Sequence, residues 1–173
     1  MRLAHVTVPG RGRTDALIAR AVDMFLADGL RVAGVVCARP PGDGAHPCDM
    51  DLRVLPDGFS RRISQPLGRA ARGCRLDGAA IEAMAAAVGA GLAGADLLVV
   101  NKFGRLEAAG RGLCGAIAQA LEMEIPVLVG VNRLNLPHFE AFAGGMAVRL
   151  EPGIDAIRAW FAAARAGALP GPA

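Results

Sequence analysis

Aromatic residues and lysine are scarce in this chain of 173 residues, which has no tyrosine and one tryptophan. Lys102 is the single lysine among 19 basic residues, and the formal net charge is +3. Few aromatic rings are therefore available for stacking on bases, which is how single strands are commonly held. We expect no nucleic-acid binding and regard a small anionic molecule as the natural ligand.

Long apolar runs and a secretion signal are also missing. Hydrophobic residues make up 53% of the chain, but no uninterrupted run approaches the roughly 18 residues of a membrane-spanning helix. A glycine-rich polar turn follows the first strand-like residues at once, unlike a signal peptide. We therefore expect a cytoplasmic protein that does not insert into membranes, and one without disulfides.

The four cysteines contain no CxxC pair, so a zinc ribbon is not indicated. Cys48 and Cys74, together with His46, are candidate ligands for a soft or borderline metal ion. The competing interpretation, which the irregular spacing favours, is that these cysteines are structural. Cys114 falls on the apolar face of a predicted helix and is expected in the core.

Short apolar runs alternate with helical patterns, which predicts a three-layer α/β fold with a mainly parallel sheet. A Pro-Asp-Gly turn within residues 50–65 predicts a β-hairpin inserted after the second strand. Residues 107–123 are predicted to form one helix. Residues 1–166 are expected to form a single domain, with 167–173 as a flexible tail. The buried strands are expected at 3–8, 31–37, 96–100 and 126–131.

The octet "TVPGRGRT" at residues 7–14 has the rhythm of a phosphate-binding loop, GxxxxGK[ST], between a strand and a helix. Such a loop holds phosphates with its amides and helix N-terminus, and its hydroxyl helps to hold Mg²⁺. Arginine replaces the lysine, which keeps the charge but not the compact geometry. The alternative is a simple turn in which Thr14 or Asp15 caps the helix. The candidate phosphate ligands are Gly10, Arg11, Gly12, Arg13 and Thr14.

A second polar cluster follows the apolar strand in "ADLLVVNKFGRLE", residues 95–107. Nucleoside-triphosphatases place acids there to hold Mg²⁺ and to position water, but this chain has Asn101 and Lys102. We expect Mg²⁺ to be held poorly, Asn101 and Lys102 to contact the ligand, and Lys102 to replace the missing lysine of the loop. Asp15 and Glu107 are the remaining candidates for a catalytic acid, and Glu107 is equally explained as a helix N-terminal acid.

Two further groups are candidate ligand contacts. Asn132 and Arg133 follow the strand 126–131, and ligands bind at the carboxyl ends of parallel strands. Arg75 ends an arginine-rich stretch, 61–75, that would bring guanidinium groups to an anion if it folds over the sheet edge. The alternatives are a strand-end loop and a solvated surface, respectively.

The order of these motifs resembles the small P-loop nucleoside-triphosphatases of the thermophilic, cancer-related type over residues 2–150. The chain resembles more closely a bacterial group, domain of unknown function 2478. This resemblance is carried by the segments "CDMDLR", "ISQPLG", "GCRLD", "NKFGRLEAAGRGL" and "PVLVGV". That group is often linked to molybdate transport and has no established activity. The resemblance implies a P-loop-like fold and leaves the function open.

The chain is therefore expected to be a degenerate P-loop protein that binds a nucleotide or another phosphate-bearing ligand, with weak or no hydrolysis. Two alternatives remain open. One is a protein that binds a molybdate-like oxyanion or a metal for cofactor supply, and the other is a weak nucleoside-triphosphatase. Nothing in the sequence indicates an oligomeric state.

Overall fold

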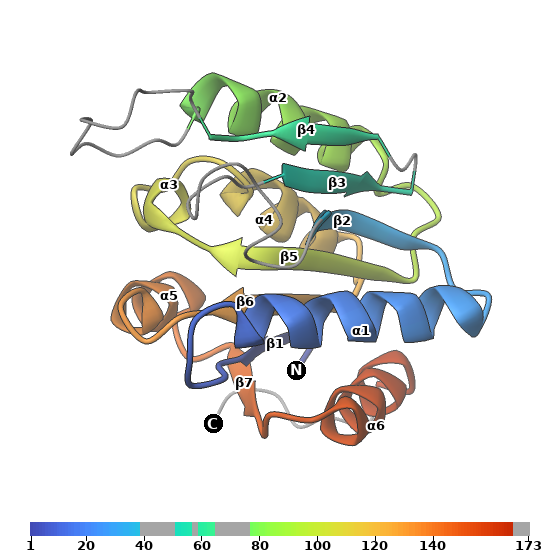
Figure 1. Cartoon of the computed structure of the whole chain (residues 1–173). Coiled ribbons are helices and arrows are strands. Elements are labelled where there is room, and N and C mark those ends of the chain that lie inside the picture. The colour runs from blue at the N-terminus through green and yellow to red at the C-terminus, as the bar shows by residue number, and fades with distance from the viewer. Residues whose placement is uncertain (39–50, 57–58, 65–76, 168–173) are drawn as a thin grey trace.

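The computed structural model describes residues 1–38, 51–56, 59–64 and 77–167 of the chain. Its centre is one sheet of seven strands in the order β4-β3-β2-β5-β6-β1-β7 (Figure 1). Residues 168–173 of the predicted tail lie outside the described residues. The strands are β1 (Leu3–Val6), β2 (Val32–Cys37), β3 (Asp51–Leu55), β4 (Ser60–Arg62), β5 (Leu97–Phe103), β6 (Val127–Val131) and β7 (Ala147–Leu150).

The sheet is parallel from β2 through β5, β6 and β1 to β7, and antiparallel only in its β2-β3-β4 part. The predicted hairpin after the second strand is therefore confirmed. The strands β1 and β5, which precede the two polar clusters, are separated by the single strand β6. Because these strands are parallel, their carboxyl ends lie at the same edge of the sheet, and ligands of parallel α/β sheets bind at that edge.

Helices cover both faces of the sheet and make the predicted three layers. On one face α1 lies in front of the sheet with α6 beside it (Figure 1). The helices α2, α3, α4 and α5 pack on the other face, where α2 contacts α4 and α3 contacts α5. The helices are α1 (Arg13–Ala27), α2 (Gly78–Ala90), α3 (Arg105–Ala108), α4 (Cys114–Glu122), α5 (Leu136–Ala143) and α6 (Ile154–Arg165).

The central strands contribute side chains to both halves of the core because successive side chains point to opposite faces. In β5, Leu97 and Val99 join the cluster under α1 and α6, whereas Leu98 and Val100 join the cluster under α2 and α4. This explains why the central strands read as continuous apolar runs. Among the described residues, no helix combines the length and apolar character that would let it span a membrane.

The prediction of one helix over 107–123 is wrong. The chain forms the short helix α3, turns at Gly110 and Gly112 with positive φ angles, and starts again at α4. The Glu107 side chain stabilises this break, because its carboxylate accepts hydrogen bonds from the backbone amides of Gly104 and Leu113. Two glycines and a locally bonded acid thus outweigh the apolar helical pattern.

His5 is buried in β1, where the residue is 4% exposed. Its ring lies 5.0 Å from that of Phe139, and its Nδ1 atom has no hydrogen-bond partner among the described residues. Burial, assisted by the charge of Arg149 and opposed by that of Glu140, lowers the pKa of His5 below its usual 6.5. At neutral pH His5 is therefore a neutral packing residue.

The lowered pKa of His5 predicts a loss of stability in acid. Below pH 6.5 the unfolded chain binds a proton that the folded chain resists, so the unfolding free energy falls as the pH drops. The fall should level off below the folded-state pKa. Urea denaturation at pH 7 and pH 5 should show the loss, and His5→Leu should reduce it. The exposed His138, replaced by Gln, should leave it unchanged; a full pH effect in His5→Leu would contradict the assignment.

Candidate functional site

The loop between β1 and α1 holds its own shape through Thr14. The Thr14 hydroxyl accepts a hydrogen bond from the Val8 amide at 3.0 Å and donates to the Val8 carbonyl at 3.4 Å. Gly12 precedes the helix in the left-handed conformation, with a φ of 72°, and no side chain caps α1. The predicted alternative, a turn whose Thr14 or Asp15 side chain caps the helix, is therefore not what the structure shows.

Arg13 begins α1 at the mouth of this loop and is exposed to solvent. Its aliphatic stem folds over Gly10, since a Cβ atom at that glycine would lie 3.0 Å from Arg13 Cδ. Within the described part of the chain, the Arg13 guanidinium has neither a hydrogen-bond nor an ion-pair partner. An unpaired guanidinium beside a helix N-terminus is suited to an anion, because both carry positive charge.

Asp15 links the loop to the second polar cluster. Lys102 Nζ lies 3.1 Å from Asp15 Oδ2, and Asn101 Nδ2 donates to Asp15 Oδ1 at 3.2 Å. The Asn101 side chain is held from its other end, because its Oδ1 accepts the Cys37 amide at 3.1 Å. Asn101 is 1% exposed, so its polar atoms need these partners. The first turn of α1 and the ends of β2 and β5 thus form one network.

The loop after β6, which contains Asn132 and Arg133, is held in place by hydrogen bonds of its asparagines. Asn132 Oδ1 accepts the Asn135 amide at 2.9 Å, and Asn135 Nδ2 donates to the Phe103 carbonyl at 3.1 Å. These bonds fasten the loop after β6 to the end of β5. Arg133 is exposed at its tip, beside Leu134, which is 86% exposed. Asn132 and Arg133 lie at the predicted edge of the sheet, and their contact with a ligand stays a prediction.

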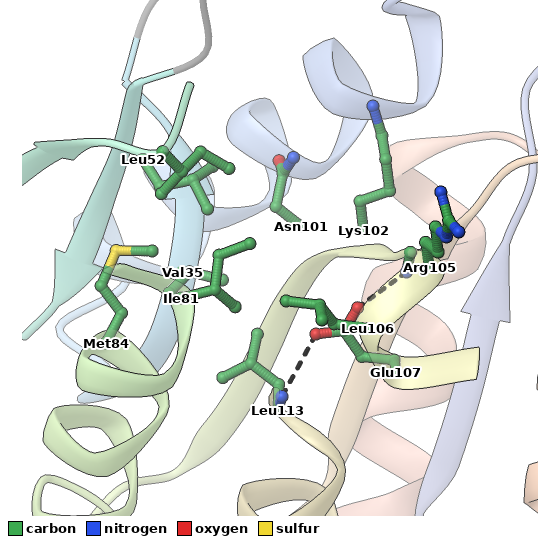
Figure 2. Close-up of a pocket in the computed structure, with 12 residues that line it drawn as sticks. Val35, Leu52, Ile81, Met84, Asn101, Lys102, Arg105, Leu106, Glu107 and Leu113 are labelled. Carbon is green, nitrogen blue, oxygen red and sulfur yellow. Dashed lines mark hydrogen bonds between the residues drawn. The ribbon is translucent and has the colours of Figure 1, made fainter. Parts of the chain in front are cut away.

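Glu107 is buried at 6% exposure, and both of its oxygens accept backbone amides. It lines a pocket of about 80 Å³ at the carboxyl end of β5 (Figure 2). Apolar side chains, including Leu52, Ile81 and Met84, gather on one side of this pocket, and Lys102 and Arg105 lie on the other. The pocket therefore combines an apolar wall with a cationic rim.

A second and larger pocket, of about 440 Å³, lies between α1 and the β2-β3 pair. Asp15 and Cys37 line it, as do Arg53 and Ser60 of the antiparallel strands. Its volume falls in the range of small-molecule sites. Asn101 and Lys102 line the smaller pocket and contact Asp15, so their network separates the two.

Four predicted site residues, Arg75, Cys48, Cys74 and His46, lie outside the described residues. Among the residues that are described, no three His, Cys, Asp or Glu side chains come together as potential metal ligands. The polar motifs of the sequence do not include two further members of the site, whose contacts depend on strand order. The Cys37 amide donates to Asn101, and Gly130 lies so close to the Asn101 carbonyl oxygen that a Cβ atom there would be 2.2 Å from it. A glycine inside a buried strand is the one signal that points to a close backbone approach there.

Comparison with known proteins agrees with this architecture. The chain belongs to the family described as protein of unknown function (DUF2478), whose profile matches residues 3–160. It is 34% identical over 163 residues to the molybdenum import ATP-binding protein ModC 2 of Bradyrhizobium diazoefficiens. That alignment covers 92% of this chain and 18% of the relative, so the chain spans less than a fifth of its length.

A solved structure shares the fold. The solution structure of a human cancer-related nucleoside triphosphatase superposes with a TM-score of 0.51 and 18% identity. The match covers 92% of this chain and 85% of the human chain. The predicted family and the P-loop-like α/β fold are confirmed.

Proposed function

We propose that this protein binds a small phosphate-bearing ligand, with a nucleotide the foremost candidate, and hydrolyses it weakly or not at all. The observation that carries the proposal is the Asp15, Asn101 and Lys102 network against the first turn of α1, next to the unpaired Arg13. Two cationic side chains and the N-terminal amides of a helix converge on one sheet edge. That arrangement favours oxyanions of phosphate type.

The surroundings and the relatives support a nucleotide. Phosphates at loop 10–14 would leave the rest of the molecule beside the 440 Å³ pocket. The names of the bacterial relative and the human structure refer to ATP binding and nucleoside triphosphates, respectively. Slow turnover is expected because the oxygens of Asp15 and Glu107 already have partners, so neither of these two carboxylates is free to activate water.

Calorimetric titration with ATP, GTP and their diphosphates, with and without Mg²⁺, tests the proposal. No heat of binding at millimolar ligand under either condition would reject it. Phosphate release measured on the same samples decides between binding alone and the alternative of a weak nucleoside-triphosphatase. Turnover that disappears in Asp15→Ala or Glu107→Ala would favour the enzyme.

The same titration predicts a partial loss of nucleotide affinity when Arg13 is replaced. Arg13→Gln should weaken nucleotide affinity roughly tenfold, which corresponds to one lost charge-assisted hydrogen bond. Arg31→Gln is the matched control, because Arg31 precedes β2 at the opposite edge of the sheet. Equal losses in the two variants would show a general charge effect and place the ligand elsewhere.

A bare oxyanion is the second candidate, favoured by the same cations and by the molybdenum import protein among the relatives. Thermal shift with molybdate, tungstate and sulfate separates it from nucleotide binding. Metal analysis of the purified protein covers the possibility that Cys48, Cys74 and His46 hold a metal ion. If no oxyanion shifts the melting temperature and no metal co-purifies, both alternatives are rejected and nucleotide binding remains.

A further inference from the structure

The residues at the phosphate-loop and β5 positions do not fit the Mg²⁺ ion that the fold implies. Mg²⁺ requires oxygen ligands in near-octahedral geometry, and P-loop proteins offer it a loop hydroxyl and an acid after a strand. Here the Thr14 hydroxyl already accepts a hydrogen bond from the Val8 amide and donates one to the Val8 carbonyl. Asn101 replaces the acid, its oxygen accepts the Cys37 amide, and its nitrogen faces Asp15. The oxygen at each position is therefore already engaged by the protein backbone.

A fixed positive charge already lies in this place. Lys102 Nζ lies 3.1 Å from Asp15 Oδ2, and the two side chains are 31% and 11% exposed. Asn101 holds the other oxygen of Asp15, so the carboxylate that positions the ammonium is itself oriented. A divalent cation entering here would meet the ammonium at short range and without full screening by water.

The residue type is informative because the chain otherwise uses arginine for its basic positions. Lys102 is the one lysine among 19 basic residues. An ammonium is compact and acts as a point charge, much as a metal ion does, whereas a guanidinium is wide and planar. The position next to Asp15 therefore has the residue that best replaces a small cation.

We infer that the Lys102 ammonium takes the place of Mg²⁺, and that the site accepts its phosphate-bearing ligand free of metal. The inference rests on the proposed function and specifies its ligand class, an uncomplexed phosphate ester or nucleotide. Mg²⁺ in solution then competes with the site for the ligand. Removing the ammonium frees the Asp15 carboxylate and converts the site to one that uses a divalent cation.

Calorimetry with ATP, in EDTA and in excess Mg²⁺, tests the inference. Wild-type protein should bind free ATP at least threefold more tightly than Mg-ATP. Lys102→Met should bind free ATP at least tenfold more weakly than wild type, and Mg²⁺ should now strengthen its binding. Lys102→Arg keeps the charge but not the shape. Its affinity for free ATP should lie between those of wild type and Lys102→Met, and Mg²⁺ should not strengthen its binding. Thermal melting checks that each variant is folded.

Mn²⁺ as a paramagnetic probe gives a readout without nucleotide. Lys102→Met should bind Mn²⁺ more tightly than wild type, and the double variant Asp15→Asn/Lys102→Met should lose that gain. Tighter ATP binding with Mg²⁺ in wild type would overturn the inference while leaving the proposed function intact. ATP binding that is absent in both EDTA and Mg²⁺ would overturn the proposed function, and the inference with it.

Discussion

Replacing Gly130 with alanine is expected to destabilise the protein by about 3 kcal/mol, the upper range for forcing atoms into a packed core. A Cβ atom at this position would lie 2.2 Å from the Asn101 carbonyl oxygen and 3.1 Å from Thr14 Cγ2. The first contact is with backbone of the neighbouring strand β5, so no side-chain rotation relieves it. Strand β5 would have to separate from β6 at the point where both meet α1.

Gly130→Ala is expected to lower both the stability of the whole protein and the ligand affinity of loop 10–14. The melting temperature should fall by roughly 10 °C, because a protein of this size loses a few degrees per kcal/mol. Displacement of Asn101 and Thr14 should also weaken any ligand bound at loop 10–14. Thermal denaturation followed by calorimetric titration at a temperature where the variant is folded measures the two effects separately.

Gly115→Ala is the matched control for this experiment. Gly115 lies in α4, and a Cβ atom there would meet nothing within 4 Å. The same substitution should therefore stabilise the protein slightly, by up to about 1 kcal/mol, since alanine favours the helix. If Gly130→Ala is as stable as Gly115→Ala, the strands β5 and β6 approach each other less closely than the structure shows.

The fold was predictable because its signals are local. Apolar runs of strand length, helical periodicity and a Pro-Asp-Gly turn each depend on neighbours in sequence, and all three gave the right element type. The helix predicted over 107–123 failed for a local reason of another kind. A side chain, Glu107, competes for backbone amides there, and apolar periodicity does not report such bonds.

The site was predictable in its members and not in its contacts. Asp15 and Lys102 are 87 positions apart, and their ion pair depends on β6 lying between β1 and β5. Strand order of this kind has no signature in either segment alone. The same applies to Asn101, whose amide joins Asp15 to the Cys37 backbone of a third strand. These contacts make Asp15 a partner of Lys102 and Asn101, and its part in catalysis stays a prediction.

Glu107→Gln should lower the free energy of unfolding by about 2 kcal/mol, the penalty for leaving one buried amide unsatisfied. Glu107 accepts the Gly104 amide at 2.9 Å and the Leu113 amide at 3.2 Å, one with each oxygen. Glutamine has the same shape but only one acceptor oxygen, so its NH₂ group would face one of these N–H groups. The break between α3 and α4 should therefore loosen.

Denaturant unfolding measures this loss, and Glu122→Gln is the control. Glu122 is exposed at the end of α4, so its substitution should change stability by less than about 0.5 kcal/mol. The Cys114 thiol offers a second readout, because burial and then the nearby charge of Glu107 raise its pKa to about 11. Removing that charge should lower the pKa of Cys114, which alkylation of this residue against pH and mass spectrometry can follow. A variant with unchanged stability and unchanged Cys114 reactivity, but with lost phosphate release, would instead make Glu107 a catalytic acid.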